Sequence, residues 1–155
     1  MERTRLEDVP NWMSPADSKR SLSNALGAEH VAVNHYELAP GEAFGFGYHR
    51  HADQEELFYI IEGEATFETE DGDVTVGAGE AIRFAPGEWQ WGRNEGDERV
   101  IALAIGAPAD AGETEISREC QECGRRREVR IEPTDDREAL VAICEACGTE
   151  VVRHS

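Results

Sequence analysis

The chain has 155 residues, of which 33 are acidic and 15 are basic, so its formal net charge is −18. A surface this acidic repels phosphate groups, which argues against binding nucleic acid through the surface as a whole. Lys19 is the only lysine. An acidic, lysine-poor surface is typical of halophilic proteins, in which high salt screens the repulsion; an acidic mesophilic protein is the alternative.

The length allows one ordinary domain with a small appendage. The first ten residues are charged and are followed by no apolar stretch, unlike a secretory signal. The longest apolar run, 100–105, is too short to span a bilayer. We therefore expect a cytoplasmic protein with no membrane association.

Residues 1–28 are polar and predict an irregular N-terminal segment, with one helical turn at 21–26 that ends at Gly27. From residue 29 the sequence changes to short runs with period-two character, separated by glycine, proline and aspartate turns. The expected strands are 31–38, 44–51, 56–62, 64–69, 73–76, 81–84, 90–94 and 100–106. Short strands with no helix between them predict an all-β fold, a jelly-roll barrel or sandwich over 29–107.

Glycine, alanine, proline and aspartate follow this region, and they predict a linker over 108–117. Residues 118–155 hold all four cysteines, with hairpin strands expected at 128–131 and 139–143. This last segment has seven basic and nine acidic residues, a net of −2, whereas the rest has eight and 24, a net of −16. The asymmetry supports a domain boundary near residue 113.

The cysteines form two CxxCG turns, with 20 residues between Cys123 and Cys144. Cys120 and Cys123 belong to the first turn, and Cys144 and Cys147 to the second. Two such turns joined by a hairpin give a tetrahedral four-sulfur site, the closed geometry of structural zinc. Four thiolates also suit iron, and a redox pair would need one CxxC in a βαβ setting. The segment 118–155 resembles the zinc ribbon family.

A second cluster of candidate metal ligands lies in the first half of the chain. His49 and His51 are two residues apart, so they project from the same face of a strand. Glu56 follows after a short turn and begins the next strand. Two imidazoles and a carboxylate suit a divalent transition metal and leave positions open for water and substrate. In the alternative interpretation, the histidines only form hydrogen bonds within the barrel.

The spacing His49-x-His51, four residues, Glu56, six residues, Gly63 resembles the first motif of the cupin superfamily. The second cupin motif aligns with residues 79–94, where Pro86 stands one position late. Gln90 occupies the position of the fourth metal ligand, which is usually histidine. The resemblance covers residues 30–106. It implies a cupin-type jelly-roll β-barrel that holds Fe, Mn, Ni or Zn through His49, His51, Glu56 and Gln90.

Two functions stay open at this point. The first is a metal-dependent small-molecule oxygenase or isomerase, in which no catalytic residue beyond the ligands is identifiable. The second is a non-catalytic binding or sensor module, whose zinc ribbon docks a partner protein. Both predict a small-molecule ligand and no nucleic acid. Apolar residues on both faces of the strand 56–62 also predict a homodimer.

Overall fold

The computed structural model describes all 155 residues, and nearly all of its regular structure is β-strand. A 3-10 turn, Leu6–Asp8, and one short helix, α1 (Leu22–Leu26), lie near the N-terminus. The strands are β1 (Ser18–Ser21), β2 (Ala32–Leu38), β3 (Tyr48–His51), β4 (Glu55–Glu62), β5 (Glu64–Thr69), β6 (Gly72–Gly77), β7 (Ala81–Phe84), β8 (Gln90–Arg93), β9 (Val100–Ala107), β10 (Thr114–Cys120), β11 (Arg125–Pro133), β12 (Leu140–Cys144) and β13 (Glu150–His154). The predicted all-β fold is confirmed.

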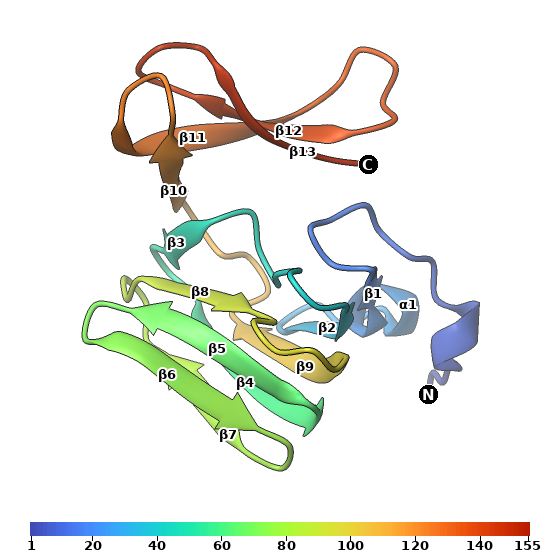
Figure 1. Cartoon of the computed structure of the whole chain (residues 1–155). Helices are drawn as coiled ribbons and strands as arrows, with labels where there is room; N and C mark the ends of the chain where they lie inside the picture. The colour runs from blue at the N-terminus through green and yellow to red at the C-terminus, as the bar shows by residue number, and fades with distance from the viewer.

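Two antiparallel sheets make up the molecule. One has five strands in the order β1-β2-β9-β4-β7, and the other has eight in the order β13-β12-β11-β10-β3-β8-β5-β6. Figure 1 shows β1–β9 gathered into one body, with β11–β13 above it and β10 as the connection. The second sheet therefore continues from the barrel into the cysteine-containing segment.

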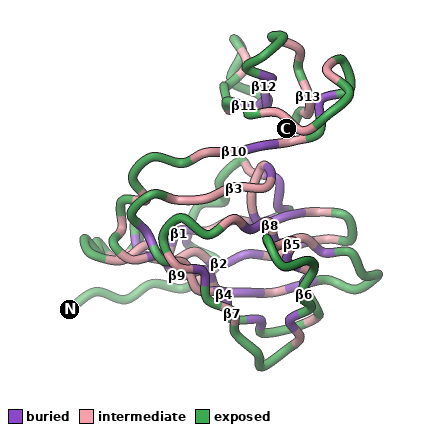
Figure 2. The backbone as a smooth tube through the Cα atoms, turned by 90° about the vertical axis from the view of Figure 1, so that its left-hand side faces the viewer, coloured by how far each residue is buried: buried purple, intermediate pink, exposed green.

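The hydrophobic core lies between the two sheets of the barrel and is built around phenylalanines. The Phe58 ring lies 5.0 Å from those of Phe44 and Phe67, measured between centroids. Aromatic rings in such contact stabilise a core beyond the area they bury. Figure 2 shows buried positions concentrated in the barrel strands, with few in β11–β13. The cysteine-containing segment has too little apolar burial to be stable on its core alone.

The inward residues of strand β9 are mostly small. Ala102, Ala104 and Gly106 alternate with outward isoleucine and leucine. A Cβ at Gly106 would lie 2.5 Å from the end of the Gln54 side chain, so a larger residue there would displace the Gln54 amide. In the pairing of β9 with β4, Gly106 lies opposite Glu56. Ala102 and Ala104 pack in the hydrophobic core, and Gln54, which lies against Gly106, lines the cavity beside Glu56.

The N-terminal turn has the capping residues expected from the sequence. The Ser21 side chain accepts a hydrogen bond from the Asn24 backbone N–H, and Gly27 ends the helix at φ 66°. Left-handed backbone of this kind favours glycine. The predicted helical turn is confirmed.

The sequence analysis missed three strands, one of which is β13, paired with β12 at the end of the chain. Strand β1 lies in the segment expected to be irregular, and β10 begins inside the expected linker 108–117. Neither has a clear alternation of apolar residues, because each is stabilised largely by backbone pairing along an existing strand, β1 with β2 and β10 with β3. The domain boundary near residue 113 stays a prediction.

Side chains of the cysteine-containing segment also contact the barrel. Arg126 forms an ion pair of 2.7 Å with Glu68, and the Arg118 guanidinium lies 4.9 Å from the Trp91 ring centroid. The His154 ring lies 5.6 Å from that of Phe46. These contacts and the shared sheet fix the segment against the barrel. No helix of the structure is long and apolar enough to cross a membrane.

Candidate metal centres

Strands from both sheets bring the histidine–carboxylate cluster together. His49 and His51 lie on β3, and Glu56 lies on β4 of the facing sheet. One potential ligand atom from each residue lies within 4.8 Å of the others, and His51 Nε2 is 3.3 Å from Glu56 Oε2. The three side chains predicted to form a site therefore converge on one point, with two nitrogens and one carboxylate oxygen available.

Hydrogen bonds orient both imidazoles. His49 Nδ1 lies 2.8 Å from the Gly47 carbonyl oxygen, which can only accept, so Nδ1 carries the proton and Nε2 keeps its lone pair. His51 Nδ1 lies 2.9 Å from Thr114 Oγ1, leaving Nε2 directed at Glu56. Burial lowers the pKa of His49, with partial opposition from the Glu56 carboxylate, so the ring stays neutral. Neutral imidazole is the form that binds a metal.

Gln90 lies with these three residues, as the second motif predicted. It pairs with His49 across β3 and β8. Its Nε2 is 2.9 Å from Glu56 Oε2 and 3.0 Å from His49 Nε2, whereas its buried Oε1 has no hydrogen-bond partner. Turning the amide end over would direct Oε1 at the cluster in place of Nε2. Two imidazole nitrogens and a carboxylate oxygen fit a divalent metal, and Gln90 Oε1 could become a fourth ligand after such a turn.

His49, His51 and Glu56 form part of the wall of a cavity of about 290 Å³. Strands of both sheets, the start of β10 and the N-terminal segment enclose it. Phe44, Phe46 and Phe58 supply apolar wall, while the ligand cluster supplies the polar part. A largely apolar cavity with a few convergent polar groups is the usual form of a small-molecule site.

The sequence analysis missed two residues of this cavity. Thr114 orients His51, but it lies 63 positions away along the chain, and only the pairing of β3 with β10 brings them together. Lys19 also lines the cavity. Lys19 stands out in the sequence as the only lysine. Its strand, however, has no apolar pattern that predicts an inward position.

The second candidate centre is the four-cysteine cluster. Cys120 and Cys147 have their Sγ atoms 3.6 Å apart, and Cys123 and Cys144 have theirs 3.9 Å apart. Tetrahedral zinc with Zn–S bonds of about 2.3 Å separates its sulfurs by about 3.8 Å, so the cluster is consistent with zinc. These separations are too long for disulfides.

The glycines after each CxxC have the conformation that this turn requires. Gly124 and Gly148 have φ of 66° and 75°, and their N–H groups donate to the Cys120 and Cys144 carbonyls. Hydrogen bonds from the Thr149 side chain and backbone lower the pKa of the Cys147 thiol to about 6. A thiol that ionises this readily is suited to binding a metal as thiolate.

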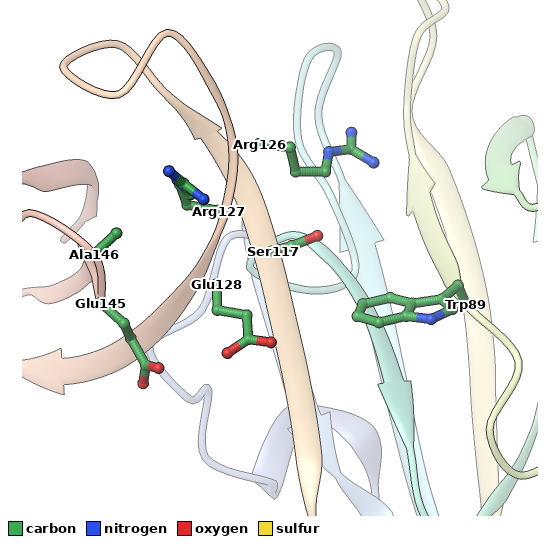
Figure 3. Close-up of a pocket in the computed structure, with 7 residues that line it drawn as sticks. All are labelled: Trp89, Ser117, Arg126, Arg127, Glu128, Glu145 and Ala146. Carbon is green, nitrogen blue, oxygen red and sulfur yellow. The ribbon is translucent and has the colours of Figure 1, made fainter.

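A larger groove of about 590 Å³ lies between the barrel and the cysteine-containing segment (Figure 3). It is lined by Trp89, Ser117, Arg126, Arg127, Glu128, Glu145 and Ala146. Trp89 stacks on Tyr48 at 5.1 Å between centroids. The groove has no histidine or cysteine, so it supplies none of the ligands predicted from the sequence.

Comparisons with known proteins place the barrel in a family. Residues 34–106 match the family model described as a cupin domain. A search of curated proteins gives no significant match. The fold is similar to a conserved protein with a double-stranded β-helix domain from Klebsiella pneumoniae, with TM-score 0.60, 19% identity, and 74% of this chain and 89% of that chain covered.

Two further solved structures have the same fold. A sugar phosphate isomerase of the cupin superfamily from Silicibacter pomeroyi has TM-score 0.62 and 16% identity, with 97% of this chain and 92% of that chain covered. A predicted oxalate decarboxylase from Thermotoga maritima has TM-score 0.60 and 22% identity, with coverage of 69% and 99%. The barrel of this chain is therefore a cupin domain, because the family model matches it over residues 34–106.

Proposed function

We propose that this protein is a metal-dependent enzyme that converts a small molecule in the barrel cavity without oxidising or reducing it, as an isomerase does. The observation that carries the proposal is the convergence of His49 Nε2, His51 Nε2 and Glu56 Oε2 on the wall of a cavity. A divalent metal held there would polarise a substrate oxygen. The isomerase among the similar structures has the same fold, which supports this reaction class only as an analogy.

Gln90 is the reason to favour chemistry without a redox step. An amide oxygen is a harder and weaker ligand than imidazole for the softer metals. In the present geometry the Gln90 amide also bridges His49 and Glu56, which holds both ligands in position. The phenylalanines of the cavity supply an apolar wall for the substrate. The alternative reaction class at this cluster is that of an oxygenase with the same three ligands.

Elemental analysis of protein purified without added metal tests the proposal. We expect one tightly held zinc per chain in the four-cysteine cluster and a second metal of variable occupancy in the barrel. Mild chelation should remove the barrel metal first, since that cluster opens to a cavity and the cysteine cluster is closed. Two equally resistant metals, or no barrel metal after incubation with Fe, Mn, Ni or Zn, would contradict it.

His51→Ala should abolish the barrel metal and leave the zinc in place. His30→Ala is the matched control, because His30 is an exposed histidine outside the cluster. Metal content of the two variants, measured side by side, separates loss of a ligand from a general effect of removing histidine.

A second candidate function is a ligand sensor whose zinc ribbon docks a partner protein. Strand β10 favours it, because Thr114 at one end contacts His51 and Cys120 at the other end belongs to the cysteine cluster. Under this candidate, filling the barrel cavity changes hydrogen exchange in β11–β13 and no substrate is turned over. Under the enzyme proposal, exchange in those strands is unchanged.

We also propose a homodimer formed through the outer face of the five-stranded sheet. Tyr59 and Ile61 are 41% and 40% exposed, and outward residues of β9 such as Leu103 adjoin them. Exposed apolar patches of this kind mark interfaces. Sedimentation in high salt, which screens the repulsion between two acidic chains, should give a dimer, and Ile61→Glu should give a monomer.

A further inference from the structure

Lys19 lies in the same cavity as the candidate metal ligands. It sits on β1, which pairs with β2 so that Lys19 lies opposite Tyr36, and this strand is outside the region that matches the cupin family. The Lys19 Nζ atom is 5.7 Å from the centroid of the Tyr36 ring. Figure 1 shows β1 at the edge of the five-stranded sheet, beside β2. The chain thus brings its only lysine to the cavity wall from an added edge strand.

The ammonium group of Lys19 has no ion-pair or hydrogen-bond partner within the protein. No carboxylate lies within ion-pair distance of it, although eight of the 14 arginines form ion pairs. Burial lowers its pKa, and the Glu56 carboxylate opposes that effect from a distance. A cation partly withdrawn from water and without an ion-pair partner is costly to maintain. In a chain with 33 carboxylates, leaving this one lysine unpaired indicates that its partner comes from outside.

The charges of the cavity favour an anion as that partner. Lys19 and Glu56 are its only permanently charged residues, so their charges cancel when the cavity is empty. A divalent cation at the histidine cluster would raise the sum to two positive charges. Both positive charges would then lie in a half-open cavity, where water screens them less than at the protein surface. A neutral ligand would leave this charge uncompensated.

We propose that Lys19 binds the anionic group, a carboxylate or a phosphate, of the small molecule that the barrel converts. This inference rests on the proposed function and names the class of its substrate. The cavity volume of about 290 Å³ equals that of roughly ten water molecules, so the ligand is small. Phe44, Phe46 and Phe58 would contact its apolar part.

Tyr36 supports the same assignment. Its ring is buried, yet its hydroxyl makes no hydrogen bond within the protein and the residue lines the cavity beside Lys19. Burial raises the pKa of Tyr36, and the Glu56 carboxylate raises it further, so the hydroxyl stays protonated and can donate. An ammonium and a neutral hydroxyl together suit an oxyanion.

Because the chain has one lysine, labelling with lysine that carries ¹³C at Cε gives a single side-chain NMR signal for the whole protein. We would titrate the labelled full chain with butyrate, with butyl phosphate and with butyramide as the neutral analogue. Saturable movement of the Lys19 signal with butyrate or butyl phosphate, and none with butyramide, is the expected result. The more tightly bound anion identifies carboxylate or phosphate as the natural group. A signal that neither anion moves, or that butyramide moves equally, overturns the proposal.

Lys19→Met should weaken binding of the same anion by about tenfold to a hundredfold, the range for one hydrogen bond to a charged group. Arg83→Met is the matched control, since it removes one positive charge from the outer face of the barrel, where Arg83 pairs with Glu55. Unchanged affinity in Lys19→Met also overturns the proposal. Barrel metal content is measured in parallel. If the barrel binds metal but no anion, only the role of Lys19 is refuted. If it binds the anion but no metal, only the proposed function is refuted.

Discussion

The two candidate metal centres both bring potential ligand atoms together but are built in different ways. In each cluster the ligand atoms lie within 4.8 Å of one another. The four cysteines come from two local turns joined by a hairpin, and all four sulfurs face one another, so no position is left for a substrate. The histidines and Glu56 come from facing sheets and border a cavity. A closed set of ligands stabilises a small fold, whereas an open set requires a fold that is already stable.

The two centres also differ in what supports them. Residues around the cysteine cluster bury little apolar surface, while the barrel has a core of 13 buried residues. Metal binding should therefore supply the folding free energy of the ribbon but only a small part of that of the barrel. A substitution at the cysteine cluster should therefore unfold its segment, whereas one at the barrel cluster should change metal binding with little effect on stability.

The largest effect is expected from Cys144→Ser, which removes one of the four sulfurs. Structural zinc supplies about 10 kcal/mol or more of apparent folding free energy in zinc-finger peptides, so β11–β13 should lose their zinc and their hydrogen-exchange protection. Elemental analysis and exchange rates measure both. Strands β2 and β9 should keep their protection, since they lie in the other sheet.

Cys144→Ser also tests how independent the two regions are. Strand β10 pairs with β3, so it should stay ordered up to about Ser117 after the ribbon unfolds. If the barrel unfolds in the same thermal transition as the ribbon, the contrast drawn here is wrong and the two regions form one cooperative unit. The expected domain boundary near residue 113 would then fail as well.

Sequence patterns could predict the ligands of both clusters because each set is marked by short spacings. The pair of CxxCG turns and the run from His49 to Gly63 specify residues that local geometry keeps together. Gln90 was recognisable only through its position in a second motif. Thr114 and Lys19 could not be found in this way, because their places depend on strands β10 and β1, which pair with distant segments and lack apolar alternation.

An intermediate effect is expected from Thr114→Val, which keeps the β-branched shape and removes the hydroxyl next to His51 Nδ1. Loss of a group that orients a ligand weakens metal binding by about tenfold to a hundredfold. Titration of the barrel with nickel or zinc should show this loss while the ribbon zinc stays bound. Ser117→Ala is a suitable control, since its hydroxyl on the same strand bonds only the Tyr48 carbonyl. Equal losses in both variants would indicate damage to β10 rather than to the orientation of His51.

A smaller effect, of opposite sign, is expected from Gln90→His. The change places an imidazole beside His49 and Glu56, where the cupin family usually has one, and should tighten binding of nickel, copper or iron. Calorimetric titration measures the affinity. An affinity for all three metals that stays the same or falls would mean that the residue at position 90 is not a ligand and only positions the other three.

Salt is the mildest perturbation, because it alters no residue, and it should act on the barrel more than on the ribbon. The barrel and N-terminal segment carry a net charge of −16, whereas residues 118–155 carry −2. The Debye length falls from about 30 Å at 0.01 M to about 3 Å at 1 M, so molar salt removes most of the repulsion between surface carboxylates. It also weakens exposed ion pairs such as Arg99–Asp17, but each of these contributes only about 0–1 kcal/mol.

We therefore expect the melting temperature of the barrel to rise with potassium chloride and to level off near molar concentration. Exchange protection in β11–β13 should change little, because this segment carries little net charge and we expect a metal in the cysteine cluster to set its stability. Equal stability of the barrel in about 0.05 M and about 2 M salt would remove the argument for a halophilic protein. The two metal clusters would be unaffected by that outcome, since they depend on residue spacing and geometry.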